Sequence, residues 1–167
     1  MNKYGFWITP DGEVFAELQK TINELASRYT APTFSPHMTL HGVVESTDSQ
    51  VVEKVQNAIK NTQPFKLELG VVEFSTTYFQ CVFVRIKTNA NLVNAHLELR
   101  NAFDSPANHV FMPHASLLYS DMNMEEREKV SNSITITESS FVANEVTIVR
   151  ADESNPKTWE VVAKVLY

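Results

Sequence analysis

A seven-residue pattern occurs twice in this chain of 167 residues and places a histidine and a hydroxyl at the same spacing each time. The copies are residues 34–40, Phe-Ser-Pro-His-Met-Thr-Leu, and residues 111–117, Phe-Met-Pro-His-Ala-Ser-Leu. Two imidazoles in one pocket can act as base and acid, because histidine titrates near pH 6.5. Two hydroxyls can bind phosphate oxygens as charge builds on them. The repeat therefore predicts a site that opens or forms a phosphodiester without a metal or other cofactor.

Both copies are expected on β-strands, where residues i and i+2 point to the same face. His37 and Thr39 then project together, as do His114 and Ser116. The proline before each histidine restricts φ and donates no ladder hydrogen bond, so it defines where the strand starts. A single histidine on such a strand is more often structural, but two copies in a shared context favour a functional pair.

The other histidines and the single cysteine are assigned mainly structural roles. His41 has the strand parity to line the site beside His37, whereas His96 falls on a helix stripe and His109 in a loop. Cys81 is most simply a small buried strand residue. Zinc would need a third ligand, and no H-E-x-x-H or C-x-x-C spacing occurs, so we predict no metal site.

The spacing of apolar residues predicts the order β-α-β-α-β twice, with the histidine motif on the second strand each time. The expected strands are residues 4–9, 37–44, 65–71, 78–87, 111–119 and 141–149, and helices are expected over residues 13–29, 92–103 and 122–133. A further helix is expected to follow an N-cap at residues 46–48, to carry Val51, Val52, Val55 and Ile59, and to end before Pro64. We therefore expect pseudo-repeats of about 3–72 and 77–150 and a final strand of about 157–166. All of them belong to one two-lobed domain spanning residues 1–167.

The predicted fold class is α+β. We expect a duplicated, bilobal fold with two mainly antiparallel sheets and outer helices around a central cleft. The chemistry depends on the two halves folding onto one another, so that both imidazoles share that cleft.

The composition limits the partners. A net charge of -6 argues against a long nucleic acid, because counterion release needs clustered Lys and Arg, but a small phosphate ester remains possible. One cysteine allows no intrachain disulfide and indicates a reducing compartment. The N-terminus lacks the apolar region of a signal peptide, and no window approaches the roughly 18 apolar residues of a membrane span. We expect a cytoplasmic monomer that binds a small-molecule substrate and no membrane.

At its two motifs the chain resembles the two-histidine phosphoesterase superfamily, which is defined by paired H-x-[S/T]-hydrophobic tetrapeptides. The tetrapeptides here are residues 37–40 and 114–117. Phe6-Trp7, Pro36, residues 77–83 and residues 111–119 further resemble the plant and yeast cyclic phosphodiesterase branch. The resemblance covers nearly the whole chain.

This resemblance implies hydrolysis of small 2′,3′-cyclic phosphates and of ADP-ribose 1″,2″-cyclic phosphate, which arises from tRNA splicing. It implies that His37 and His114 form the acid and base pair and that Thr39 and Ser116 hold the phosphate. Which ring is the base stays open on the sequence. By analogy we assign His114 to activating water and His37 to the leaving group.

In this branch aromatic side chains line the nucleoside end of the cleft, and Trp7, Phe79 and Tyr119 occupy the corresponding places. Tyr119 has the wrong parity for the face of His114, so it reaches the site only if the strand ends or bends near residues 120–121. Tyr78 is the alternative to Phe79.

Three other functions stay open. The same site could process RNA ends or join 2′-5′ RNA bonds, which the acidic net charge disfavours. It could bind a nucleotide without turnover, or the domain could be structural. A steep salt dependence of oligonucleotide binding would favour the RNA enzyme. Affinity for a 2′-nucleotide without turnover of any cyclic phosphate would favour the binding module.

Overall fold

The computed structural model describes residues 1–106, 110–151 and 154–167. Within them, the chain forms eight strands and four helices. The strands are β1 (Asn2–Ile8), β2 (Met38–Ser46), β3 (Phe65–Phe74), β4 (Val82–Ile86), β5 (His114–Leu118), β6 (Ser140–Ala143), β7 (Glu145–Arg150) and β8 (Glu160–Leu166). They form one sheet in the order β6-β3-β4-β5-β2-β1-β7-β8. Every neighbouring pair is antiparallel.

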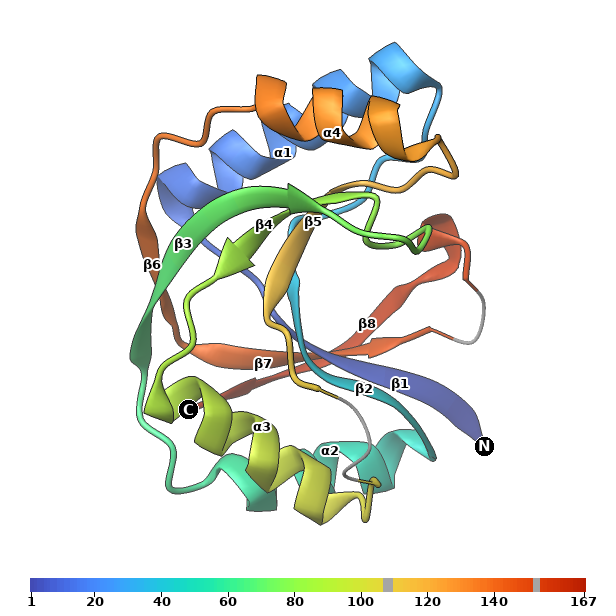
Figure 1. Ribbon diagram of the computed structural model, residues 1–167. Helices are drawn as coiled ribbons and strands as arrows, with labels where there is room; N and C mark the ends of the chain where they lie inside the picture. The colour runs from blue at the N-terminus through green and yellow to red at the C-terminus, as the bar shows by residue number, and fades with distance from the viewer. Residues whose placement is uncertain (107–109, 152–153) are drawn as a thin grey trace.

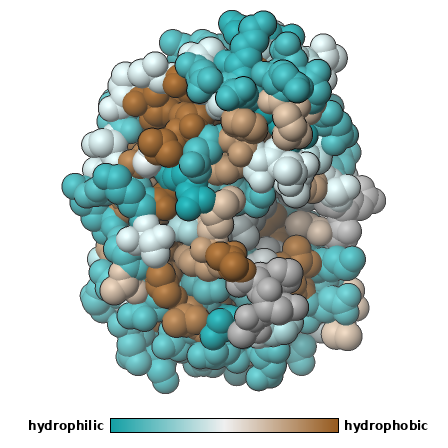
Figure 2. Space-filling view, in the orientation of Figure 1, coloured by the Kyte–Doolittle hydropathy of each residue, from teal (hydrophilic) through white to brown (hydrophobic). Residues whose placement is uncertain are grey.

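The helices pack in two pairs on the outside of the curved sheet (Figure 1). They are α1 (Gly12–Tyr29), α2 (Asp48–Ile59), α3 (Ala90–Ala102) and α4 (Met124–Ser133), and a short 3₁₀ turn, η1 (Pro156–Thr158), precedes β8. α1 packs on β5 and α4 on β3 and β4, whereas α3 packs on β2 and α2 on β8. The top and bottom of the molecule, where the helices lie, are largely hydrophilic, and hydrophobic residues appear between them (Figure 2).

Local sequence explains why the helices form where they do. The buried positions of α1 include Val14, Leu18, Ile22 and Leu25, which recur with helical spacing and form one apolar stripe. α2 begins after Thr47, whose side chain accepts a hydrogen bond from a backbone amide in the first turn. Among the described residues, no helix combines the length and the apolar character needed to cross a membrane.

The α+β class, the antiparallel pairing and the outer helices are confirmed, but the prediction of two separate sheets was wrong. The motif strands β2 and β5 pair with each other at Met38 and Ala115, and this contact joins two four-stranded halves into one sheet. Left apart, each half would expose an edge strand with unpaired backbone groups. Joining the edges satisfies both strands.

Several strand ends differ from the predicted ones by a few residues, and the strand expected over residues 111–119 is confined to His114–Leu118; two differences have a clear local cause. The strand expected over residues 78–87 begins only at Val82, because residues 75–80 form a turn whose ends are tied by a hydrogen bond from the Ser75 amide to the Gln80 carbonyl. The strand expected over residues 141–149 is divided at Asn144 into β6 and β7. β6 pairs with β3, whereas β7 pairs with β1 and β8.

The third strand of each sequence repeat pairs in the opposite half of the sheet. β3, from the first repeat, lies between β4 and β6, and β7, from the second repeat, lies between β1 and β8. Neither repeat can therefore complete its own half of the sheet. For this reason we propose that residues 1–167 form a single two-lobed domain rather than two independent units.

Candidate active site

The joint between β2 and β5 brings the two motifs side by side. The second residues of the two H-x-[S/T]-L motifs pair across the joint, so antiparallel register sets His37 opposite Ser116 and Thr39 opposite His114. Opposite side chains are about 5 Å apart and diagonal ones roughly 7 to 8 Å, so the two imidazoles flank a space suited to one phosphate. All four side chains line a single cleft of about 870 Å³.

The leucine that ends each motif is an extra residue in its strand. Leu40 is a bulge in β2, because its neighbours Thr39 and His41 pair with consecutive residues of β1. Leu117 is the equivalent bulge in β5, because its neighbours pair with consecutive residues of β4. A bulge changes the face to which the following residues point. His41 is accordingly buried and does not line the cleft, so the strand parity that made it a possible lining residue does not hold beyond the bulge.

Both motif histidines make the same backbone hydrogen bond. Nδ1 of His37 lies 2.7 Å from the carbonyl oxygen of Ser35, and Nδ1 of His114 lies 2.8 Å from that of Met112. A carbonyl oxygen can only accept, so each Nδ1 carries a proton and each neutral ring keeps Nε2 as its acceptor. The motif therefore fixes the orientation and the tautomer of both rings.

The two imidazoles differ in burial. His37 is 8% exposed, and its ring stacks on Trp7 with 3.7 Å between ring centroids. Burial lowers the pKa of His37 to about 4, against the opposing effect of its backbone hydrogen bond, and charge on His114 lowers it further. His114 is half-buried, and its pKa is also lowered, first by burial and then by the charge of Arg85. Both rings are thus mainly neutral at pH 7 in the free protein.

The two hydroxyls are not in equivalent surroundings. Thr39 is exposed within the cleft, whereas Ser116 is buried. The Ser116 hydroxyl donates a hydrogen bond to the carbonyl oxygen of Phe79 at 2.7 Å. Thr39 can therefore meet a phosphate oxygen directly, but Ser116 has to exchange its present acceptor before it can donate to a ligand.

Four aromatic side chains, Trp7, Phe79, Tyr119 and Trp159, line the cleft together, and we call them the aromatic wall. The first three are the aromatic residues predicted from the sequence. Trp159 follows η1, and its ring lies 5.4 Å from Trp7, 6.3 Å from Phe79 and 6.3 Å from Tyr119, measured between centroids. No local pattern pointed to Trp159, because only the pairing of β8 with β7 beside β1 brings it to the cleft.

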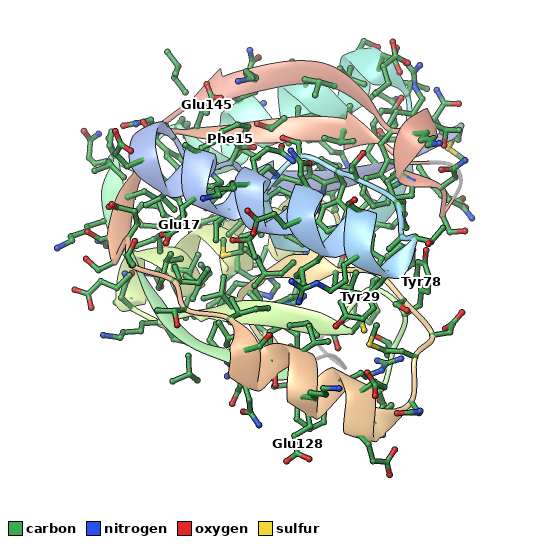
Figure 3. All side chains as sticks on the ribbon, turned by 90° about the horizontal axis from the view of Figure 1, so that it is seen from above. Phe15, Glu17, Tyr29, Tyr78, Glu128 and Glu145 are labelled. Atoms are coloured by element: carbon green, nitrogen blue, oxygen red, sulfur yellow. The ribbon has the colours of Figure 1, made fainter. Side chains whose placement is uncertain are left out.

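Local geometry explains why Tyr119 faces the cleft and why Phe79, rather than Tyr78, lines it. Tyr119 lies one residue beyond the end of β5, after the bulge, and so points into the cleft. Phe79 also lines the cleft, whereas Tyr78 lies near Tyr29 at the C-terminal end of α1 (Figure 3).

A buried arginine anchors the turn that carries Phe79. Arg127 of α4 is 3% exposed, and its guanidinium donates to the carbonyl oxygens of Ser75 and Thr77 at 2.6 and 2.8 Å. It donates to two further carbonyls in the segment after β5 at 2.9 and 3.0 Å. These bonds tie together the two segments that present Phe79 and Tyr119, so α4 supports the aromatic wall from behind.

The remaining histidines lie elsewhere. Nδ1 of His96 is 2.7 Å from the carbonyl oxygen of the bulge residue Leu40, and Nε2 of His41 is 2.9 Å from the Ser105 hydroxyl. His96 therefore stabilises the bulge from α3. His109 lies outside the described residues. Among those that are described, no group of three or more His, Cys, Asp or Glu side chains is placed to hold a metal ion.

This arrangement has the components for acid and base chemistry on a small anion. Two imidazoles whose Nδ1 atoms are bonded to the backbone and an exposed hydroxyl line the same cleft, and an apolar wall beside them can stack a planar group. The cleft volume falls in the range of pockets that bury small ligands.

The chain is similar to known proteins in sequence and in fold. Residues 1–166 match the family described as cyclic phosphodiesterase-like protein. The cyclic phosphodiesterase of Arabidopsis thaliana is 28% identical over 167 aligned positions, which cover 96% of this chain and 92% of the plant protein. The crystal structure of E. coli LigT in its apo form superposes with a TM-score of 0.66 and 18% identity, covering 99% of this chain and 96% of LigT. LigT complexed with 3′-AMP gives a TM-score of 0.64 at 18% identity, with coverage of 99% and 97%. Because the family matches nearly every residue, the chain belongs to the cyclic phosphodiesterase-like protein family.

Proposed function

We propose that this protein hydrolyses a small, nucleotide-derived cyclic phosphodiester, using His37 and His114 as its acid and base and no metal ion. The substrates we propose are nucleoside 2′,3′-cyclic phosphates and ADP-ribose 1″,2″-cyclic phosphate. Homology to a cyclic phosphodiesterase over 96% of the chain places it among the phosphoric diester hydrolases. The observation that carries the histidine mechanism is the matched pair of Nδ1–carbonyl hydrogen bonds, which leaves both Nε2 atoms for the cleft.

In the proposed reaction, a water oxygen attacks the phosphorus of a 2′,3′-cyclic phosphate as its proton passes to Nε2 of His114. The bond from phosphorus to the ribose 3′ oxygen breaks, and that oxygen takes the proton on Nε2 of His37. The product is a nucleoside 2′-phosphate. Thr39 binds a non-bridging oxygen directly, and Ser116 joins it by releasing its present acceptor.

Burial supports this division of roles. His114 is the more exposed ring and therefore the one that water reaches. His37 lies against Trp7 and edge-on to Trp159, with ring centroids 3.7 and 5.9 Å away, so it stands beside the surface that would hold the leaving nucleoside. His37 must gain its proton when the substrate binds, because the negative phosphate offsets the cost of a buried positive charge.

Hydrolysis is tested with the four nucleoside 2′,3′-cyclic phosphates, ADP-ribose 1″,2″-cyclic phosphate and a short RNA with a cyclic phosphate end, each with EDTA present. We expect turnover of the small substrates, a bell-shaped pH profile and a loss of several orders of magnitude in His37→Ala or His114→Ala. The variant Lys20→Ala is the control, because Lys20 lies on α1 outside the cleft and its side chain is exposed. Activity that disappears with EDTA would refute the metal-free mechanism, and binding of a 2′-nucleotide without any turnover would identify a binding module.

A substrate with sulfur in place of the 3′ bridging oxygen separates the acid from the base. A thiolate leaves without a proton more readily than an alkoxide, because thiols are far more acidic than alcohols. We expect His37→Ala to regain much of its activity on the sulfur substrate and His114→Ala to regain none. Recovery in His114→Ala instead would reverse the assignment.

A further inference from the structure

The two motif histidines have different neighbours on the strands that flank the joint between β2 and β5. On one side, Arg85 of β4 pairs directly with His114. On the other side, the register between β1 and β2, continued by one residue beyond its last pair, sets Thr9 opposite His37. Directly opposite residues of an antiparallel pair point to the same face of the sheet. A cationic side chain therefore leaves the sheet beside His114, where a small neutral one lies beside His37.

The neighbouring strand β3 accommodates Arg85 in two ways. A Cβ added at Gly70 would lie 3.2 Å from the Cβ of Arg85, so glycine at this position lets the stem of the arginine approach the strand closely. A carboxylate oxygen of Glu73 lies 3.5 Å from Nε of Arg85, and the two side chains are 46% and 38% exposed. A single long contact between half-exposed groups is a weak ion pair. The positive charge beside His114 is therefore only partly offset.

The charge of Arg85 acts on one ring and not on the other. Burial contributes most to the lowering of the pKa of His114, and the charge of Arg85 adds to it. The pKa of His37 is lowered by burial and by the charge of His114, without a contribution from Arg85. On its outer side β5 packs against α1, whose buried stripe is apolar. The other titratable side chains that line the cleft with His114 are His37, Lys3, Glu45 and Tyr119.

We propose that Arg85 is a positioning residue that decides which of the two imidazoles carries the proton when the substrate is bound. The inference rests on the proposed function and adds to it the residue that makes the two motifs unequal. A bound phosphodiester favours a proton on either ring, because its negative charge lies between them. The cation of Arg85 opposes that proton on His114 only, and Thr9 offers no such opposition on His37. The proton therefore resides on His37, and His114 stays ready to accept the proton of water.

The first test is an NMR titration of the imidazole rings in the free protein, with each ring assigned by the loss of its signal in a His→Asn variant. Arg85→Gln should move the titration midpoint of His114 to higher pH. Glu73→Gln leaves the cation without its carboxylate and should move the midpoint to lower pH. Arg85→Lys keeps the charge and should move it less than Arg85→Gln does. Arg28→Gln is the matched control, because it removes an exposed cation of α1 that does not act on His114. The midpoint of His37 should move less than that of His114 in Arg85→Gln.

Steady-state kinetics then separate positioning from substrate binding. With uridine 2′,3′-cyclic phosphate, Arg85→Gln should lower kcat by about threefold or more on the acid side of the pH profile and by less than about twofold near its maximum. An unmoved His114 midpoint in Arg85→Gln would overturn the inference, as would a loss of equal size at every pH, which would make Arg85 a residue that binds the substrate. Both results leave the proposed function intact, because the wild-type protein still hydrolyses the substrate. Failure of the wild-type protein to hydrolyse any cyclic phosphate would instead reject the proposed function, and the NMR titration would still show whether Arg85 controls the proton on His114.

Discussion

Ligand binding in this cleft should be coupled to uptake of a proton by His37. In the free protein the pKa of His37 is about 4, so only about one molecule in a thousand carries that proton at pH 7. A bound phosphodiester places a negative charge beside the ring. If this charge restores the pKa to roughly 6.5, the affinity should rise by about 20-fold between pH 7 and pH 5. The sign follows because the complex holds more protons than the free protein, so acid favours the complex.

The measurement needs a ligand that does not titrate and a protein that does not consume it. Uridine 2′,3′-cyclic phosphate keeps one negative charge throughout this range, and His114→Ala removes the proposed base. Isothermal titration calorimetry from pH 5 to 7.5, repeated in buffers with different ionisation enthalpies, gives both the affinity and the number of protons taken up. We expect uptake to approach one proton per ligand near pH 5.5.

The double variant His37→Asn, His114→Ala is the control, and its affinity should not depend on pH. Equal affinity of the single variant at pH 5 and pH 7, with no proton uptake, would refute the coupling. In that case His37 would stay neutral in the complex, and it could not protonate the leaving group.

Three further perturbations test the site and the stability of the fold. In steady-state kinetics, Trp159→Leu should raise KM for uridine 2′,3′-cyclic phosphate by about fivefold or more and change kcat little, since stacking on an aromatic ring contributes about 1 to 3 kcal/mol. A loss confined to kcat would contradict a stacking role for Trp159. Arg127→Met should lower the free energy of unfolding by about 3 kcal/mol or more in urea titrations, because buried carbonyls lose their donors, and Arg127→Lys should recover part of it. A loss below about 1 kcal/mol would show that water replaces the guanidinium. Glu17 (Figure 3) accepts hydrogen bonds from the amide and hydroxyl of Thr137 and from the next amide; burial alone would raise its pKa, but these bonds lower it overall. The stabilisation from Glu17 is therefore present above the pKa of the unfolded state and is lost as the pH falls through the lower pKa of the folded state. The variant Glu17→Gln should flatten the acid end of a plot of Tm against pH. An unchanged slope would show that Glu17 makes no such contribution.

The parts of the fold that the sequence predicts are those with a local signal. The apolar stripe of α1 and the cap at Thr47 define helices whatever surrounds them. The pairing of β2 with β5 has no such signal, because it depends on both halves being present at once. The exchange of β3 and β7 between the halves has no local signal for the same reason. The sequence therefore predicted two sheets where the structure has one.

The candidate site divides in the same way. His37, Thr39, His114 and Ser116 are visible because one motif occurs twice. The different environments of Thr39 and Ser116 are not visible, because the hydrogen bond from Ser116 to Phe79 joins residues far apart in the chain. His41 was misplaced because period-2 parity assumes an uninterrupted strand, and the register shift at Leu40 breaks it.

The repeated motif supplies symmetric geometry, and the surroundings make it asymmetric. Both imidazoles have the same tautomer, and each bonds the carbonyl oxygen two residues before it, so the motif alone gives two equivalent groups. Hydrolysis needs one ring to give a proton while the other takes one, and the difference has to come from outside the motif. Trp7 and Trp159 surround His37, whereas His114 remains half-buried. A duplicated strand thus provides the pair, and in the proposed reaction the unequal neighbours would decide which ring meets the leaving group.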